Sequence, residues 1–152
     1  MCGLTEDAGD YICSRSNFAG DIAWAKTFGS GHMFGMDVTP EAVFLTGHTR
    51  AGVENWDTLT VKVDPNSGKE LWRAKCGNPR GFDPAYVHDE AWGVQATPDG
   101  GCLIVAGTGD EYSSYSACSP SSGDCSDSWK VYLVRFAAGG DVLWETTFGG
   151  NF

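Results

Sequence analysis

The chain has 152 residues, which is enough for one domain with a buried core. It carries 20 acidic and 10 basic residues, a net charge of −10, and this argues against nucleic acid as a partner because phosphate binding needs a basic surface. The 21 glycines and six tryptophans favour short strands and tight turns, and no apolar run is long enough for a transmembrane helix.

Residues 1–30 contain three predicted strands. Segment 1–6 matches the second strand of the later copies, and segment 11–16 alternates apolar and polar residues, as a strand with one buried face does. The next strand carries Trp24, four residues after the turn glycine Gly20. We interpret these residues as a partial repeat unit that lacks its first strand.

Residues 31–77 repeat this pattern and add the missing first strand. The first two strands are predicted at 34–40 and 43–49, and the third is the alternating segment 59–63. The fourth strand again carries a tryptophan four residues after a turn glycine, here Gly68 and Trp72.

Residues 78–89 form a polar linker to the next unit. Its end brings a histidine next to carboxylates, a composition also found at general bases and metal sites. We favour a solvated acidic loop over either site. The residues concerned are Asp83, His88, Asp89 and Glu90.

Residues 90–152 form a complete unit with one large insertion. The first two strands, 92–98 and 103–109, match those of the preceding unit, and the insertion 110–128 separates them from the third strand, 131–136. Insertions at loops leave a strand core intact and are common places for function. The fourth strand repeats the earlier spacing with Gly140 and Trp144.

The sequence therefore predicts an all-β fold of four-stranded antiparallel units, about 2.75 of them, each the size of a β-propeller blade. A propeller normally has at least four blades, and open sheet edges invite aggregation. We therefore expect either a fragment of a longer chain or several chains that complete the ring. The third strand of each copy ends near one basic residue: Arg15, Lys62 and Arg135.

The segment Val63-Asp64-Pro65-Asn66-Ser67-Gly68-Lys69-Glu70-Leu71-Trp72 resembles the repeat of quinoprotein-like propellers, the pyrroloquinoline-quinone type. In that family an Asp-x-x-x-Gly-x-x-x-Trp pattern closes each blade. The spacing before the glycine here is one residue longer than in the tightest version of this pattern. The resemblance covers nearly the whole chain outside 78–89 and 110–128. It implies that the tryptophans pack between blades and lock neighbouring sheets together.

The same resemblance implies, for catalytic members, an aspartate base, calcium ligands and often a vicinal cysteine pair. This sequence has no Cys-Cys dipeptide, and its asparagines fall in turn or loop contexts. We therefore assign no catalytic or cofactor-binding residue and predict no cofactor, with an oxidoreductase kept as an alternative.

The insertion offers oxygen ligands that are candidates for calcium, although their spacing does not match an EF-hand loop. These are Asp110, Glu111, Asp124 and Asp127. Aromatic residues near loops are candidates for stacking on a sugar, as in a lectin. These are Trp56, Tyr112, Tyr115 and Trp129. Trp56 and Trp129 both begin a third strand, which favours packing for this pair.

Cys118 and Cys125 bracket a small polar loop, which predicts a local disulfide and an oxidising compartment. The other four cysteines fall in predicted strands, and their connectivity is left open. No basic segment followed by an apolar one opens the chain, so no signal peptide is visible. We expect an extracellular or secretory-pathway scaffold whose partners are further blades, other subunits or a glycan.

Overall fold

The computed structural model describes residues 2–4, 10–49, 56–78, 87–110 and 129–149. These residues form two antiparallel sheets and no helix, so none of them belongs to a helix that could cross a membrane. The strand order is β1-β2-β3-β4-β5-β6 in one sheet and β10-β9-β8-β7 in the other. Within the described residues the two sheets do not close on each other. The predicted all-β fold is confirmed.

The strands of the first sheet are β1 (Cys2–Leu4), β2 (Asp10–Ser16), β3 (Ile22–Val38), β4 (Val43–Thr49), β5 (Thr58–Val63) and β6 (Glu70–Cys76). Those of the second are β7 (Val87–Ala96), β8 (Cys102–Asp110), β9 (Lys130–Phe136) and β10 (Val142–Phe148). Each predicted strand is present, although β3 joins two of them into one continuous strand. Its residues up to Ser30 pair with β2, and those from Gly31 pair with β4.

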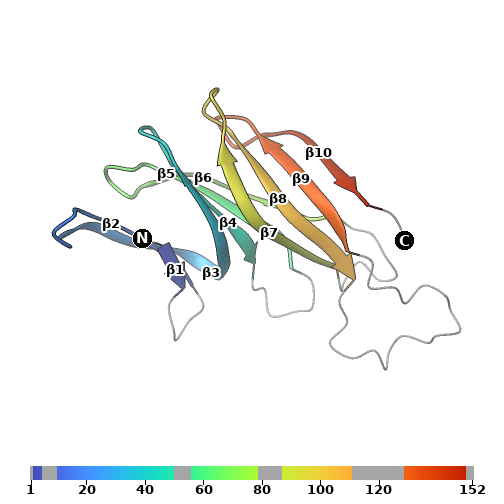
Figure 1. The fold of residues 1–152 in the computed structure, drawn as a ribbon, viewed down its shortest axis with the longest axis horizontal. Helices are drawn as coiled ribbons and strands as arrows, with labels where there is room; N and C mark the ends of the chain where they lie inside the picture. The colour runs from blue at the N-terminus through green and yellow to red at the C-terminus, as the bar shows by residue number, and fades with distance from the viewer. Residues whose placement is uncertain (1, 5–9, 50–55, 79–86, 111–128, 150–152) are drawn as a thin grey trace, which may run out of the picture.

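The three predicted repeat units map onto this pairing, and Figure 1 shows their strands side by side from the blue N-terminal strands to the red β10. The first unit is β1, β2 and the beginning of β3. The second is the end of β3 with β4, β5 and β6, and the third is β7 to β10. We call the contact between the first two units the first seam, and the contact between the last two the second seam.

Each seam contains one hydrophobic cluster, because alternating strand residues send every second side chain toward the neighbouring unit. The first cluster is Tyr11, Cys13, Trp24, Phe28, Val43, Leu45, Leu59, Val61 and Val63. The second is Ala42, Phe44, Ala91, Cys102, Ile104, Ala106, Tyr132, Val134 and Phe136, with Trp72, Ala74 and Cys76 packed against it.

The antiparallel strands give the molecule two distinct ends. Short hydrogen-bonded turns lie at one end, which we call the turn end: residues 17–21, 39–42, 64–69, 97–101 and 137–141. The strand ends that border segments 50–55, 79–86 and 111–128 all lie at the other, the loop end. The long connections therefore all start and finish on one side of the sheets.

The expected acidic loop before the third unit differs from the structure. Strand β7 begins at Val87, so that His88, Asp89 and Glu90 lie in a strand. Their exposed fractions are 7%, 1% and 8%. The three residues are polar, but β7 packs beside β4 and the end of β3, and this contact removes them from water.

Candidate functional site: the seams between repeat units

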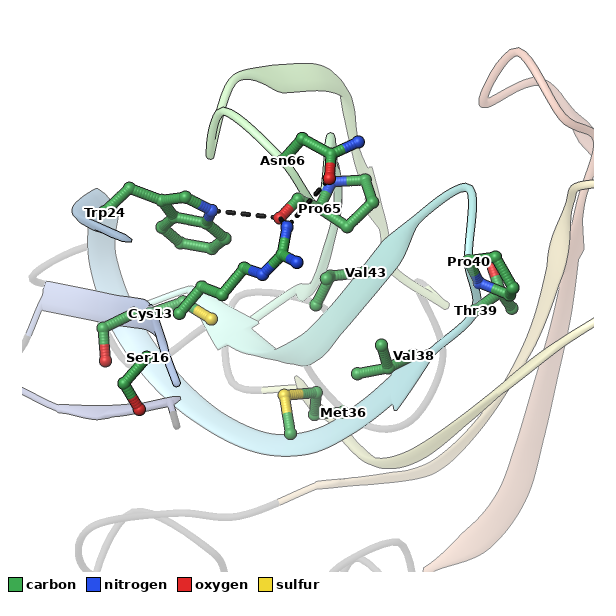
Figure 2. Close-up of a pocket in the computed structure, with 12 residues that line it drawn as sticks. Cys13, Ser16, Trp24, Met36, Val38, Thr39, Pro40, Val43, Pro65 and Asn66 are labelled. Carbon is green, nitrogen blue, oxygen red and sulfur yellow. Dashed lines mark hydrogen bonds between the residues drawn. The ribbon is translucent and has the colours of Figure 1, made fainter. Parts of the chain in front are cut away.

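The turn end of the first seam is held by a hydrogen-bonded lock on one backbone carbonyl. The Trp24 indole donates from Nε1 to the Pro65 carbonyl oxygen at 3.1 Å, as Figure 2 shows. Arg15 lies opposite Trp24 across the β2–β3 ladder and donates to the same oxygen at 2.9 Å. It also donates to Asn66 Oδ1 at 2.8 Å. Two side chains of the first unit therefore donate hydrogen bonds to one turn of the second unit.

The second seam repeats this lock with different residues. Trp72 donates from Nε1 to the Ala138 carbonyl oxygen at 2.9 Å. Lys62 lies opposite Trp72 across the β5–β6 ladder and donates from Nζ to the same oxygen at 3.1 Å. It also donates to the Gly100 carbonyl oxygen at 2.8 Å. Because both seams use a tryptophan and a facing cation, the lock belongs to the repeat.

The turn glycines of the repeat make room for the tryptophan of the neighbouring unit. A Cβ atom on Gly68 would lie 2.7 Å from the Trp24 ring, and one on Gly140 would lie 2.9 Å from the Trp72 ring. Both glycines have positive φ angles, 69° and 97°, which favour glycine in any case. The regular glycine-to-tryptophan spacing along the chain thus comes from contacts between consecutive units.

The third unit carries the same pair, but no further unit packs on it within the described residues. Arg135 lies opposite Trp144 in the β9–β10 ladder, but its guanidinium donates to the Asp99 carboxylate at 2.6 and 2.7 Å within its own unit. The Thr97 hydroxyl and this guanidinium hold the pKa of Asp99 well below its usual range. The Trp144 side of the lock faces solvent, with 46% of the residue exposed.

The loop end of the second seam contains an aromatic stack. The Trp56 ring lies between two buried histidines, with ring centroids 4.4 Å from His48 and 4.1 Å from His88 and interplanar angles of 3° and 9°. The main chain holds it there, because Trp56 N donates to the Val87 carbonyl at 3.2 Å and Asp89 N donates to the Trp56 carbonyl at 2.6 Å. Both faces of this predicted stacking residue are therefore covered by protein.

The other described stacking candidate, Trp129, has a different setting. Its ring lies against β8, where a Cβ atom on Gly107 or Gly109 would approach it to 2.8 or 2.6 Å. It is 39% exposed, so one side of the ring faces solvent. The two glycines of β8 leave the flat surface on which this indole rests.

Ionisable side chains gather beside the aromatic stack. Asp89 Oδ2 accepts from the Asn78 backbone N–H at 2.9 Å, and Tyr132 donates to Glu145 across the β9–β10 ladder. Burial, with Glu145 as the next cause, raises the pKa of the Cys76 thiol to about 11. Burial also raises the pKa of Tyr132. Both groups therefore stay protonated at neutral pH. The Cys76 thiol is then a poor nucleophile, because only the thiolate form of a cysteine is reactive.

Two grooves follow the seams at the turn end. The first, of about 330 Å³, runs past Arg15, Trp24 and Pro65 and is the one drawn in Figure 2. The second, of about 470 Å³, lies between the 39–42 and 97–101 turns and includes Lys62. In both grooves the cation is already engaged by the lock, so the grooves are part of the contact between units.

Most of the residues predicted in the insertion lie outside the described residues. Asp110 is the last residue of β8, opposite Val87. In the described part of the chain no three His, Cys, Asp or Glu side chains come together as a metal site. The predictions that lie outside it are Asp83 of the acidic cluster, the ligands Glu111, Asp124 and Asp127, the aromatic residues Tyr112 and Tyr115, and the pair Cys118 and Cys125.

The remaining cysteines lie in strands, as predicted. Cys2 and Cys13 lie opposite each other in the register of the β1–β2 ladder. Cys76 and Cys102 are free thiols on either side of the second seam.

The role of the basic residues in the lock was not predicted from the sequence. In the sequence, Arg15, Lys62 and Arg135 stand out only as a recurring feature of the third strands. Their position nine or ten residues before each tryptophan was the available signal, because two strands joined by a tight turn place such residues opposite each other. The buried histidines of the aromatic stack gave no comparable signal, since the stack combines residues of two separate strands, β4 and β7, with Trp56 from outside the strands.

No known protein family matches this sequence, and a search of curated proteins also finds no match. The seams are therefore interpreted from their own geometry.

Proposed function

We propose that this chain is a segment of a β-propeller-type repeat protein that serves as a structural or binding scaffold. The supporting observation is the lock that joins successive units in the same way twice, from Trp24 and Arg15 to Pro65 and from Trp72 and Lys62 to Ala138. A contact that each unit offers to the next is what a radial array of blades requires. The quinoprotein-like resemblance of the repeat agrees with this arrangement.

The two ends of the molecule support different roles in the scaffold. The locks occupy the turn end, while the strand ends bordering segments 50–55, 79–86 and 111–128 lie at the loop end. Binding residues often lie on loops held by a rigid scaffold. We therefore assign recognition of a protein or glycan to the loop end and cohesion to the turn end.

A titration distinguishes this scaffold from a quinone enzyme. Tryptophan fluorescence and the midpoint of thermal unfolding are measured with calcium, with EDTA and with pyrroloquinoline quinone. The scaffold proposal expects neither to change, because packing between units supplies the stability. Saturable quinone binding together with reduction of an added acceptor that depends on an oxidisable substrate would overturn it, and specific signals on a glycan array would identify the scaffold as a lectin.

We also propose an extracellular or secretory-pathway location, which rests on the even number of cysteines. Peptide mapping of the protein secreted from eukaryotic cells, without reductant, should recover a peptide linking Cys118 and Cys125. Recovery of six unmodified thiols would contradict this location.

A further inference from the structure

The outer face of the third unit is apolar and open. Five large hydrophobic residues on β8, β9, β10 and the residue before β9 expose between 39% and 54% of their surface. These are Val105, Trp129, Val131, Trp144 and Phe148. Contiguous exposed apolar surface of this kind marks an interaction site more often than a solvent-facing sheet.

The same face is covered in the two preceding units. In the first unit, Trp24 and Phe28 stand four residues apart on one strand and are buried in the first seam. In the second unit, Trp72 and Cys76 have this spacing and pack into the second seam. Trp144 and Phe148 repeat the spacing on β10. The open face is thus the third copy of a surface that docks on a neighbouring unit twice within this chain.

A turn that matches the receiving turns of the two seams is also open, at the other end of the chain. The turn 17–21 has the hydrogen bonds of the turn 137–141: Asn17 and Ala137 accept from the glycine N–H three residues on, both at 3.1 Å, and each donates to the residue four positions on. Phe18 therefore occupies the place of Ala138, whose carbonyl accepts from Trp72. Phe18 is fully exposed, and a Cβ atom on Gly20 would meet nothing within 4 Å.

We propose that the outer face of the third unit docks onto the first unit of a second copy of this chain, with Trp144 lying on the Gly20 turn. The indole Nε1 then donates to the Phe18 carbonyl oxygen of the second copy. The occupant is another copy because one chain carries both an open tryptophan face and an open receiving turn, and its two internal seams already join such a face to such a turn. The inference rests on the proposed scaffold function and supplies one of its partners.

This contact is head-to-tail, so that each copy keeps one open face and one open turn after docking. Such a heterologous contact yields rings if the rotation closes and open chains of copies if it does not. The net charge of −10 opposes the approach of two copies, and salt screens this repulsion. Association should therefore increase with protein concentration and with ionic strength.

Sedimentation velocity over a range of concentrations tests the contact. The wild-type chain should form dimers and larger species, and both Trp144→Ala and Gly20→Ala should weaken association at least tenfold. The control for the first variant is Leu143→Ala, the exposed residue that precedes Trp144 on β10. The control for the second is Gly29→Ala, which has nearly the same φ angle, 93° against 92°, at the opposite end of the first unit.

Mixing the two variants gives the sharper result. A Trp144→Ala copy still offers its Gly20 turn, and a Gly20→Ala copy still offers its Trp144 face, so the mixture should form a one-to-one dimer and nothing larger. Equal association of wild type and both variants would overturn the inference, as would a wild-type chain that stays monomeric at high concentration and salt. The ligand titrations are run on the monomeric Trp144→Ala variant, so that a failure of the scaffold function is seen separately.

Discussion

The two seams are alike at the turn end and different at the loop end. At the turn end of each seam, a tryptophan and a facing cation donate to the same carbonyl oxygen of the neighbouring unit. At the loop end of the first seam, Tyr11 fills the space beside Gly47 and donates to the His48 carbonyl at 3.4 Å. At the loop end of the second, Trp56 stacks between histidines with Asp89 close by.

The difference follows from how each pair of units is connected. In the first seam β3 runs from one unit into the next without leaving the sheet, so a single tyrosine completes the packing. In the second seam β6 and β7 are separate strands, and Trp56 pairs with the beginning of β7. The turn end thus carries the repeated architecture, and the loop end carries what is particular to each unit.

Removing the tryptophan of the first seam should have the largest effect on stability. Trp24 is 8% exposed, and Trp24→Ala should cost about 3–5 kcal/mol in the free energy of unfolding, as buried tryptophans generally do. Trp144→Ala should cost about 0.5 kcal/mol or less in the monomer, because this residue is 46% exposed. Urea unfolding at low protein concentration measures both, and equal losses would show that the lock does not stabilise the seam.

Filling the glycine beneath each tryptophan should have the next largest effect. Gly68→Ala and Gly140→Ala should each cost about 2–4 kcal/mol, since the methyl group meets an indole ring and the backbone has a positive φ angle. Gly20→Ala is the matched control, with a positive φ angle and open space, and should cost about 1 kcal/mol. Thermal unfolding compares the three variants, and a control as damaging as the other two would assign the whole effect to backbone strain.

Alkaline pH should weaken the second seam through its thiols. Burial raises the pKa of Cys76 to about 11 and that of Cys102 to about 12, from an ordinary value of 9.0. The folded state keeps these protons longer than the unfolded chain does, so the stabilisation is complete below pH 9 and is lost as pH rises toward 11 and 12. At pH 10 the loss should be roughly 1 kcal/mol for the buried Cys102 thiol and less for Cys76, because solvent screens a partly exposed group.

Urea unfolding at pH 7 and pH 10, with reductant, measures this loss. Cys102→Ala should lower stability at pH 7 but reduce the difference between the two pH values. An unchanged difference would mean that the thiols do not carry the alkaline effect. The first seam offers a comparison, because the pKa of its Tyr11 is also raised by burial but from 10.0, so its contribution is lost at higher pH.

The strands and their order within each unit were predictable, because period-two alternation and turn glycines are local signals. The contribution of Trp24 and Trp72 was expected from the resemblance, and the structure adds the carbonyl that each one binds. That carbonyl lies 41 or 66 residues further along the chain. No local pattern specifies such a partner, so the lock could be recognised only by comparing the seams.

The loop end shows where composition misleads. His88, Asp89 and Glu90 resemble a solvated loop because polar residues are normally exposed. They are buried because β7 is packed between the end of β3 and the other strands of its own sheet, and because Trp56 covers one histidine ring. Burial of a polar segment depends on contacts between units, and these contacts leave no periodic trace in the segment itself.

The cation of the lock gives the smallest effect and the finest distinction between the seams. Lys62→Met should cost about 1 kcal/mol, because Lys62 donates to two carbonyls and lies 5.4 Å above the Phe44 ring. Arg15→Met should cost about 0.5 kcal/mol, because Arg15 is exposed and its hydrogen bonds are open to water. Lys75→Met, on the opposite face of β6, is the control and should leave the urea midpoint unchanged. A larger loss of stability for Arg15→Met than for Lys62→Met would mean that the contact between Lys62 and the Phe44 ring adds nothing. The difference would then come from the hydrogen bonds that each cation makes to the carbonyl in its own seam.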